Sequence, residues 1–186
     1  MKQFLLLTAC LSFCASVQAA SIDGHSIPDQ LPAADGPLVL NGAGLRDKFM
    51  IDLYVGGLYL PQKSSDADAI IGSDKPMAMR LLIVSSRITS ENLSEAVAEG
   101  FEHALGNRQA AMQPRIDDFL NTFKQEAIKQ GDVFEMLYQP GSGTLISKNG
   151  KQINSIEGLD FKSAMFAIWL GREPAQKSLK EAMLGQ

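Results

Sequence analysis

The residue with the clearest potential chemistry in this sequence is Arg46, which lies in an apolar, glycine-rich stretch from Leu40 to Pro61. A guanidinium group beside apolar strands needs an anion, because an unpaired charge away from water is costly. Tyr54 belongs to the same stretch and offers a phenolic donor. Asp47 or Asp52 would supply the anion internally, and a bound ligand would supply it externally. The stretch therefore supports two hypotheses, an internal ion pair and a ligand site.

Other kinds of site have little support in the sequence. Cys10 and Cys14 fall within the first 19 residues, so the rest of the chain has no cysteine for a disulfide, a thiol nucleophile or a thiolate metal site. His25 and His103 are far apart, and no His-x-x-x-His spacing is present, so we predict no metal site and no cofactor. The net charge is −4 without a basic run, which argues against nucleic acid as a partner.

The stretch that carries Arg46 and Tyr54 is predicted to form two strands, because it is rich in aliphatic and aromatic residues. Its four glycines indicate close approach by another backbone or by a ligand. If Asp47 and Lys48 form the turn, the Cα atoms of Arg46 and Tyr54 lie roughly 15 Å apart along a straight ladder at about 3.3 Å per residue. Their convergence would then require a bend or sheet curvature.

The remaining periodicities predict an α+β domain with an antiparallel sheet covered by helices on one side. Apolar residues at helical spacing predict helices over 89–106 and from Met112 to a stop at 129–131. A period of two over 133–138, followed by an Asn149-Gly150 turn between 144–148 and 151–156, predicts three antiparallel strands. The other predicted elements are a strand over 79–84, a helix over 161–170 and a last helix opened by Pro174. Arg80 and Arg87, which flank that strand, are expected to be solvated.

The N-terminus has the pattern of a secretory signal over residues 1–19: Lys2, an apolar run, and the small-residue site Val17-Gln18-Ala19. We therefore expect a mature chain from about Ala20 and a single domain over 20–186. Acylation at Cys10 is the alternative. No second apolar run approaches the ~20 residues of a membrane span, so the expected location is periplasmic or otherwise exported, and soluble after cleavage.

Several motifs together resemble the bacterial, exported branch of the chalcone-isomerase-like proteins. They agree in order from Leu40 to Gly185 and include Gly42-Ala43-Gly44-Leu45-Arg46, Tyr54-Val55-Gly56-Gly57-Leu58-Tyr59-Leu60, Gly131-Asp132, Tyr138-x-Pro140-Gly141, Asn149-Gly150 and Ile168-Trp169-Leu170-Gly171. The resemblance implies an open-faced β-sandwich, in which a curved antiparallel sheet and a layer of α-helices enclose a ligand cleft.

The resemblance also implies where a site would lie. Arg46 matches the arginine that polarises the substrate carbonyl in the plant isomerases. The other catalytic positions of those enzymes fall here on different side chains, namely Tyr54, Thr89, Asn92, Ala96 and Ile168. Arginine with tyrosine instead resembles the fatty-acid-binding members of the fold, where such a pair holds a carboxylate. The predicted ligand-binding residues are accordingly Arg46, Tyr54, Thr89, Asn92, Ile168 and Trp169, with a core position as the alternative for Trp169.

Three functions follow as hypotheses. The first is a non-catalytic binder of a small amphipathic ligand, such as a fatty acid, with Arg46 at the head group. The second is an intramolecular lyase or isomerase that uses Arg46 as the catalytic electrophile on an unknown carbonyl compound. The third is an interaction protein that keeps the fold without a ligand. Enzymatic activity is left open. The binder is favoured because a lyase at neutral pH needs a positioned proton donor or acceptor, and only tyrosine and water are evident candidates here.

Overall fold

The protein is described by a computed structural model over residues 19–186, so all but the last residue of the predicted signal segment lies outside the described part. The main feature is a curled antiparallel sheet of seven strands in the order β3 to β9, in which every strand pairs with its neighbour in sequence. A separate hairpin, β1 (Ala19–Ile22) and β2 (His25–Pro28), precedes it. The sheet strands are β3 (Gln30–Leu31), β4 (Leu38–Lys48), β5 (Ile51–Leu60), β6 (Met77–Ile83), β7 (Val133–Gln139), β8 (Gly143–Lys148) and β9 (Lys151–Ile156).

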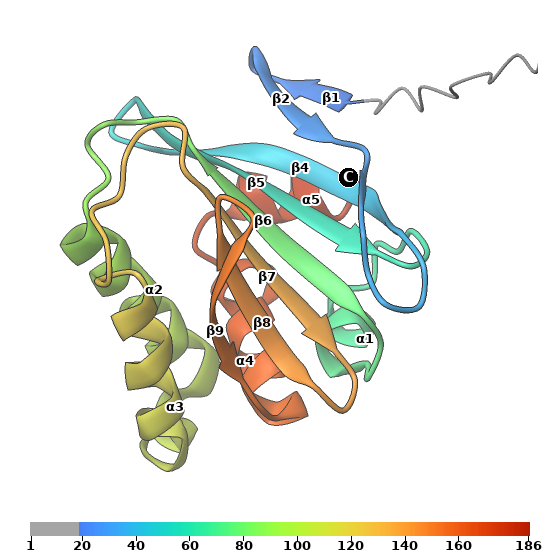
Figure 1. The fold of residues 1–186 in the computed structure, drawn as a ribbon, viewed down its shortest axis with the longest axis vertical. Coiled ribbons are helices and arrows are strands. Elements are labelled where there is room, and N and C mark those ends of the chain that lie inside the picture. The colour runs from blue at the N-terminus through green and yellow to red at the C-terminus, as the bar shows by residue number, and fades with distance from the viewer. Residues whose placement is uncertain (1–18) are drawn as a thin grey trace, which may run out of the picture.

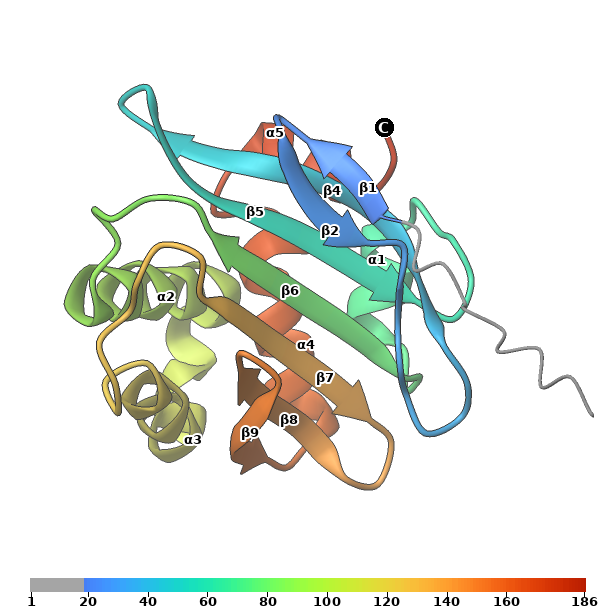
Figure 2. The ribbon, with the colours of Figure 1, turned by 45° about the horizontal axis from the view of Figure 1, so that its top comes forward.

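The helices gather on one face and one side of this sheet. Helix α4 runs behind the sheet, α2 and α3 stand beside it, and the β1–β2 hairpin lies in front of β4 and β5 (Figure 1, Figure 2). The helices are α1 (Ala67–Gly72), α2 (Ser90–Leu105), α3 (Gln109–Thr122), α4 (Leu159–Leu170) and α5 (Lys177–Met183), with a 3₁₀ turn over Gly106–Arg108. The predicted α+β architecture with a curved, helix-covered antiparallel sheet is confirmed.

The core between sheet and helices is well filled. A cluster of phenylalanines joins α2, α3, α4 and β7 through ring centroids 5.2–5.8 Å apart: Phe101, Phe119, Phe123, Phe134 and Phe161. Edge-to-face pairs of this kind add to the stabilisation from burial. A smaller apolar cluster on the opposite face includes Tyr59 and Ala78. All five phenylalanines are at most 1% exposed, so the space between sheet and helices is packed with side chains at this level.

The β4–β5 hairpin turns two residues later than the sequence suggested. Lys48 pairs with Ile51, and the two-residue loop consists of Phe49 and Met50, with φ angles of 54° and 61°. Positive φ at both loop residues is typical of a type I′ turn, which normally selects Asn-Gly. The hypothetical turn at Asp47 and Lys48 is therefore wrong, because Phe49 and Met50 adopt the left-handed conformation without the usual turn residues.

The glycines of the hairpin make room for the last helix. A Cβ atom at Gly42 would lie 2.1 Å from the carbonyl oxygen of Ala182, and one at Gly44 would lie 2.8 Å from the Cβ of Ala182. Helix α5 thus packs directly on the backbone of β4. Of the two explanations for these glycines, close approach by another backbone applies at Gly42, whereas Gly44 makes room for the Ala182 side chain.

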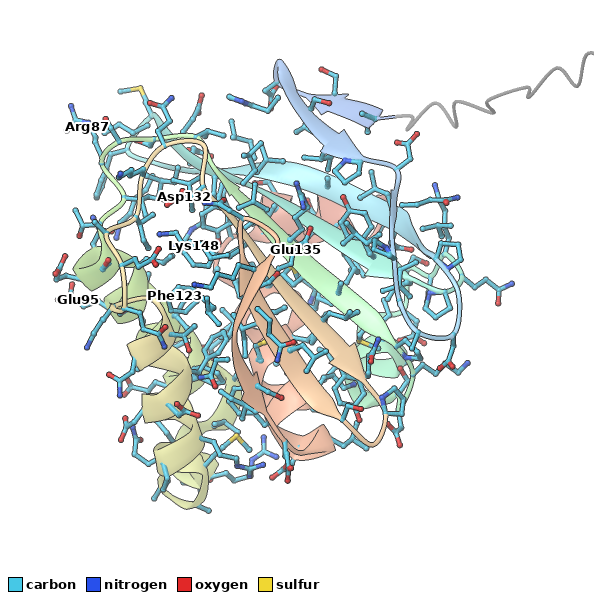
Figure 3. The ribbon with its side chains drawn as sticks, in the orientation of Figure 1. Arg87, Glu95, Phe123, Asp132, Glu135 and Lys148 are labelled. Carbon is cyan, nitrogen blue, oxygen red and sulfur yellow. The ribbon has the colours of Figure 1, made fainter. Side chains whose placement is uncertain are left out.

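Helix α3 ends at Thr122, earlier than the predicted stop at 129–131. The apolar residues beyond it belong to a loop that returns to the sheet, where Ile128 is buried. Asp132 holds this loop, because its carboxylate accepts hydrogen bonds from the backbone N–H of Lys129 and from the Asn149 side chain. Lys148 lies 3.1 Å from the same carboxylate, and Figure 3 shows the two side chains near each other. Burial alone would raise the pKa of Asp132, but these partners hold that pKa below its usual value.

Two further local expectations need correction. Arg80 forms an ion pair with Glu135 across β6 and β7, and its side chain is only 19% exposed, so it is not a solvated cation. The last helix begins at Lys177, three residues beyond Pro174.

One fully buried cation connects α4 with the end of α1. The Nζ atom of Lys162 donates to the carbonyl oxygens of Ile71 and Ser73 at 2.7 and 2.6 Å. These are carbonyls that a helix end leaves without intrahelical partners. The same ammonium lies 5.4 Å from the ring centroid of Tyr138. Burial lowers the pKa of Lys162 to about 8.

Candidate functional site

Arg46 and Tyr54 are brought together by strand pairing. They are direct partners in the β4–β5 register, just before a β-bulge between Arg46 and Asp47. The Nη1 atom of Arg46 lies 3.4 Å from the Tyr54 hydroxyl, and its guanidinium carbon lies 5.7 Å from the centre of the Tyr54 ring. The turn at Phe49 and Met50 and the adjacent β-bulge produce this proximity together, because the turn alone would place Arg46 opposite Leu53 and the bulge shifts its partner to Tyr54.

The Tyr54 hydroxyl is also held by a residue of helix α4. The indole N–H of Trp169 donates to it at 2.8 Å, and both side chains are only 2% exposed. The phenolic oxygen therefore accepts hydrogen bonds from Trp169 and Arg46. A tyrosine hydroxyl can donate one hydrogen bond in addition to accepting. The Tyr54 hydroxyl can thus donate a hydrogen bond to an acceptor bound next to Arg46.

A pocket of about 240 Å³ opens beside this pair. One wall comes from the β4–β5 hairpin, and the other from the loop before α2 and the first turns of that helix. Its apolar lining is formed by Phe49, Ile51, Leu53, Ile88, Leu93 and Ala96. The polar part is formed by Arg46, Lys48, Tyr54, Arg87 and Asn92. An apolar surface with a few convergent polar groups is the usual composition of a small-molecule site.

The charged residues that line this pocket are all positive. Arg46, Lys48 and Arg87 line it, and no aspartate or glutamate does. Within residues 19–186, none of the three has a carboxylate oxygen within 4.0 Å. The internal ion pair considered for Arg46 is therefore not formed in the described chain. The site is locally positive in a protein whose net charge is −4, which favours an anion.

Thr89 and Asn92 lie at the start of α2 and are hydrogen-bonded to each other. The Thr89 hydroxyl accepts from the backbone N–H of Asn92, and the Asn92 side chain accepts from the backbone N–H of Thr89. This reciprocal arrangement is a capping box. The Asn92 amide also donates to the carbonyl of Arg87 at 2.8 Å. Asn92 reaches the pocket wall, whereas Thr89 contributes by holding the loop that carries Arg87 and Ile88.

Ile168 and Trp169 occupy the core behind the pocket. Ile168 is 2% exposed and packs against α2, where a Cβ atom at Gly100 would lie 2.6 Å from its Cγ2. Trp169 touches the site only through Tyr54. Neither residue lines the pocket beside Arg46. Their contribution is to position α2 and the tyrosine.

A second hollow, of about 320 Å³, lies on the other side of Arg46. It shares Arg46, Lys48 and Ala96 with the first pocket, and its remaining walls come from Asp47, α2 and the segment before α5. Glu99 and His103 are among its lining residues. Arg46 therefore stands between a predominantly apolar pocket and a more polar one.

Part of the lining could not be identified from the sequence. Lys48, Phe49 and Arg87 have no local signature of a site, and their convergence depends on the β4–β5 turn and on the position of α2. The alternation of Ile51 and Leu53 along β5 was the one available signal for a shared apolar wall. Among the described residues, no group of three His, Cys, Asp or Glu side chains is arranged to hold a metal ion.

Comparison with known proteins places this geometry in context. A family described as chalcone isomerase-like matches residues 19–185. The crystal structure of an Arabidopsis thaliana fatty-acid binding protein, AtFAP1, matches with a TM-score of 0.72 and 19% sequence identity. The match covers 90% of this chain and 96% of the plant protein, and at this identity it shows the fold alone. No curated protein matches the sequence. No helix in residues 19–186 has the length and hydropathy needed to span a membrane.

Proposed function

Because this chain belongs to the chalcone isomerase-like family, we propose that it is a non-catalytic binder of a small amphipathic carboxylate, held in the pocket beside Arg46. The observation that carries the proposal is the arrangement of Arg46 and the Tyr54 hydroxyl at the edge of an apolar pocket lined by cations and no carboxylate. The fatty-acid binding protein of the same fold supports this class of ligand.

The head group is proposed to lie between Arg46 and Tyr54. The guanidinium would give one carboxylate oxygen a charge-assisted hydrogen bond, and the Tyr54 hydroxyl would donate a second. Lys48 and Arg87 would add attraction without fixed geometry, because both belong to the exposed rim. Hydrogen bonds to charged groups contribute roughly 1.5–3 kcal/mol. These contacts would set the orientation of the ligand and select an acid over a neutral analogue.

The tail is proposed to lie against Ile51, Leu53, Ile88 and Leu93. Each buried methylene group contributes about 0.8 kcal/mol, which corresponds to about a fourfold increase in affinity. A volume of about 240 Å³ is below the range of roughly 300–1,000 Å³ typical of ligand pockets. We therefore infer a short or medium chain, with any longer tail leaving the pocket along the hairpin. Affinity would rise with chain length and then level off.

Calorimetric titration with saturated carboxylates of increasing length tests this proposal. Arg46→Ala should weaken the best acid about ten- to a hundred-fold, while the neutral alcohol with the same tail should change little. Arg46→Lys should recover part of the loss, because an ammonium cannot form the planar two-point contact. Arg108→Ala is the matched control, since Arg108 is exposed and bonds the carbonyl of Ala104. Equal losses for acid and alcohol, or no binding by the parent protein, would contradict the proposal.

The lyase hypothesis is the less favoured alternative. Tyr54 is the one uncharged proton donor that lies directly beside Arg46 in the predominantly apolar pocket, and no histidine, aspartate or glutamate lines it. General acid–base chemistry normally needs such a group within hydrogen-bond reach of the substrate. The protein is therefore expected not to accelerate chalcone cyclisation. A rate above background that is lost in Arg46→Ala would overturn the assignment as a binder.

The proposed location is the periplasm or another exported compartment. The support is the sequence pattern of residues 1–19, which ends in the small-residue site before Ala20. N-terminal sequencing of the protein from its native host should find a chain that starts at or near Ala20. An intact Met1 or an acylated Cys10 would contradict this location.

A further inference from the structure

The tip of the β4–β5 hairpin exposes two large apolar side chains that the fold does not require. Phe49 is 84% exposed and Met50 is 96% exposed. In residues 19–186 the only other exposed large hydrophobic residue is Leu159, at 38%. Both tip residues also have positive φ, where Asn and Gly would be less strained. Neither the stability of the turn nor the packing of the core therefore accounts for these two residue types.

Cations are arranged immediately behind the tip. The Nζ atom of Lys48 lies 5.8 Å from the centre of the Phe49 ring. Arg87, from the loop before α2, lines the same pocket as Phe49 and lies at the end of the molecule where the hairpin turns (Figure 3). Two acids are also present on the hairpin. Asp47 and Asp52 are paired one step farther from the tip than Lys48, and Asp47 accepts a hydrogen bond from Gln176.

We propose that this tip docks reversibly on the surface of an anionic phospholipid bilayer. Phe49 and Met50 would enter the boundary between head groups and acyl chains, and Lys48 and Arg87 would contact the lipid phosphates. Two adjacent side chains form too small a patch for a stable protein interface, which needs roughly 800 Å² on each partner. A single myristoyl chain gives only marginal and reversible membrane binding, so two apolar side chains beside two cations would give a weak and reversible contact.

The pocket lies beside the tip, so docking would bring its opening to the bilayer. Phe49 and Lys48 belong both to the tip and to the pocket wall, so a docked tip places the pocket opening at the level of the lipid head groups. An amphipathic carboxylate could then pass between bilayer and pocket with its tail shielded from water. This exchange rests on the proposed function, whereas the docking itself requires no ligand and is tested without one.

Fluorescence can locate the contact at the tip. In Phe49→Trp the introduced indole should be quenched by lipids brominated on their acyl chains, in vesicles of phosphatidylglycerol and phosphatidylcholine. Leu159→Trp is the matched control, because it places an indole at the other exposed apolar position, at the start of α4. The native Trp169 is buried and provides a constant background. Quenching should be at least threefold stronger in Phe49→Trp than in Leu159→Trp, and it should fall with added salt or without phosphatidylglycerol.

Vesicle co-sedimentation provides the second measurement. The parent protein and all variants begin at the same residue. Phe49→Asn combined with Met50→Gly supplies preferred type I′ residues, so the hairpin should be retained while vesicle affinity falls about tenfold or more. Lys48→Glu with Arg87→Glu should lower binding to anionic vesicles only, and Asp52→Lys should raise it. Tyr54→Phe should leave docking unchanged, which separates this proposal from ligand binding.

Two results with vesicles would overturn the proposal, and a third would come from ultracentrifugation. One is equal quenching of the two introduced indoles, or no quenching of either. The other is unchanged sedimentation of the Phe49→Asn, Met50→Gly variant with anionic vesicles. If the parent protein instead self-associates in ultracentrifugation and the double variant does not, the tip contacts a second copy of the chain and the bilayer proposal is wrong.

Discussion

The indole N–H of Trp169 donates to the hydroxyl of Tyr54, so helix α4 fixes the phenol that lies opposite Arg46 on the hairpin. A residue of the core thereby determines the position of a polar group in the pocket. The relationship also means that the tyrosine hydroxyl serves both stability and the proposed recognition of an anion.

Removing that hydroxyl should have two measurable effects. Tyr54→Phe leaves the buried indole N–H without its acceptor, so the free energy of unfolding should fall by about 1–3 kcal/mol. Carboxylate affinity should also fall, because one of the two proposed head-group donors is lost. Tyr59→Phe is the control, since Tyr59 bonds the carbonyl of Pro28 and does not line the pocket. Similar losses of carboxylate affinity in both variants would contradict this role of Tyr54.

The pH dependence of stability should reveal the buried Lys162. Its pKa is about 8 in the folded protein and about 10.4 in an unfolded chain. Between these values the unfolded chain binds more protons, so stability rises with pH, and the unfavourable contribution is complete below pH 8. From pH 7.5 to 9.5 the parent should gain about 2 kcal/mol relative to Lys162→Met in urea denaturation.

This pH range is chosen to avoid the tyrosines. Burial raises the pKa of Tyr138 to about 12, with a further contribution from its hydrogen bond to Asp74. A raised tyrosine pKa changes stability in the opposite direction. Stability falls as the pH rises from the tyrosine pKa of the unfolded chain to that of the folded protein. Because both proteins contain Tyr138, their difference reports Lys162. Parallel pH profiles would show that the Lys162 ammonium is equally stable in folded and unfolded chains.

Substitution of Gly42 should displace the last helix. The new methyl group of Gly42→Ala would overlap the carbonyl oxygen of Ala182, and overpacking of this kind costs roughly 1–3 kcal/mol. Limited proteolysis should therefore cut near α5 faster than in the parent. Gly72→Ala is the control, because a Cβ atom at Gly72 meets nothing within 4 Å. Retention of parental stability in Gly42→Ala would show that α5 can shift without cost.

The β4–β5 turn should gain stability when its residues are replaced by Asn-Gly. A left-handed conformation costs an L-residue about 1–2 kcal/mol, and Asn and Gly tolerate it best. The Phe49→Asn, Met50→Gly variant should therefore unfold at a higher urea concentration, with an increase of about 1–2 kcal/mol in the free energy of unfolding. Asn149→Phe combined with Gly150→Met provides the converse test in the β8–β9 turn. It should lose at least as much, because Asn149 also bonds Asp132.

The contrast between these two turns explains how far the sequence could be interpreted. Asn149-Gly150 carries local turn chemistry, and the three strands around it were predicted with nearly correct bounds. Phe49-Met50 carries none, so the sequence offers Asp47 and Lys48 only as a hypothetical turn and does not give the register of Arg46 with Tyr54. Strand existence follows from composition, whereas register depends on the turn itself.

The site shows the same division between local and distant information. Arg46 and Tyr54 can be selected because they lie in one apolar stretch, and Thr89 and Asn92 because they match catalytic positions of the plant isomerases. That Arg87 reaches the hairpin depends on where α2 packs against α4, at Gly100 and Ile168. No pattern in a single segment contains this information. The end of α3 was also missed, since the apolar residues after Thr122 belong to a buried loop rather than to a continued helix stripe.

The neighbour-to-neighbour order of the sheet has a consequence for how the chain folds. Strands β3 to β6 can pair one after another across connections of at most 16 residues, and β7 to β9 can do the same. The junction between β6 and β7 is different, because residues 84–132, with α2 and α3, must first fold back. We expect that junction to form in the rate-limiting step, joining two preformed meanders. The pocket wall from α2 would then be completed at the same step, so folding intermediates would lack the ligand site while containing most of the sheet.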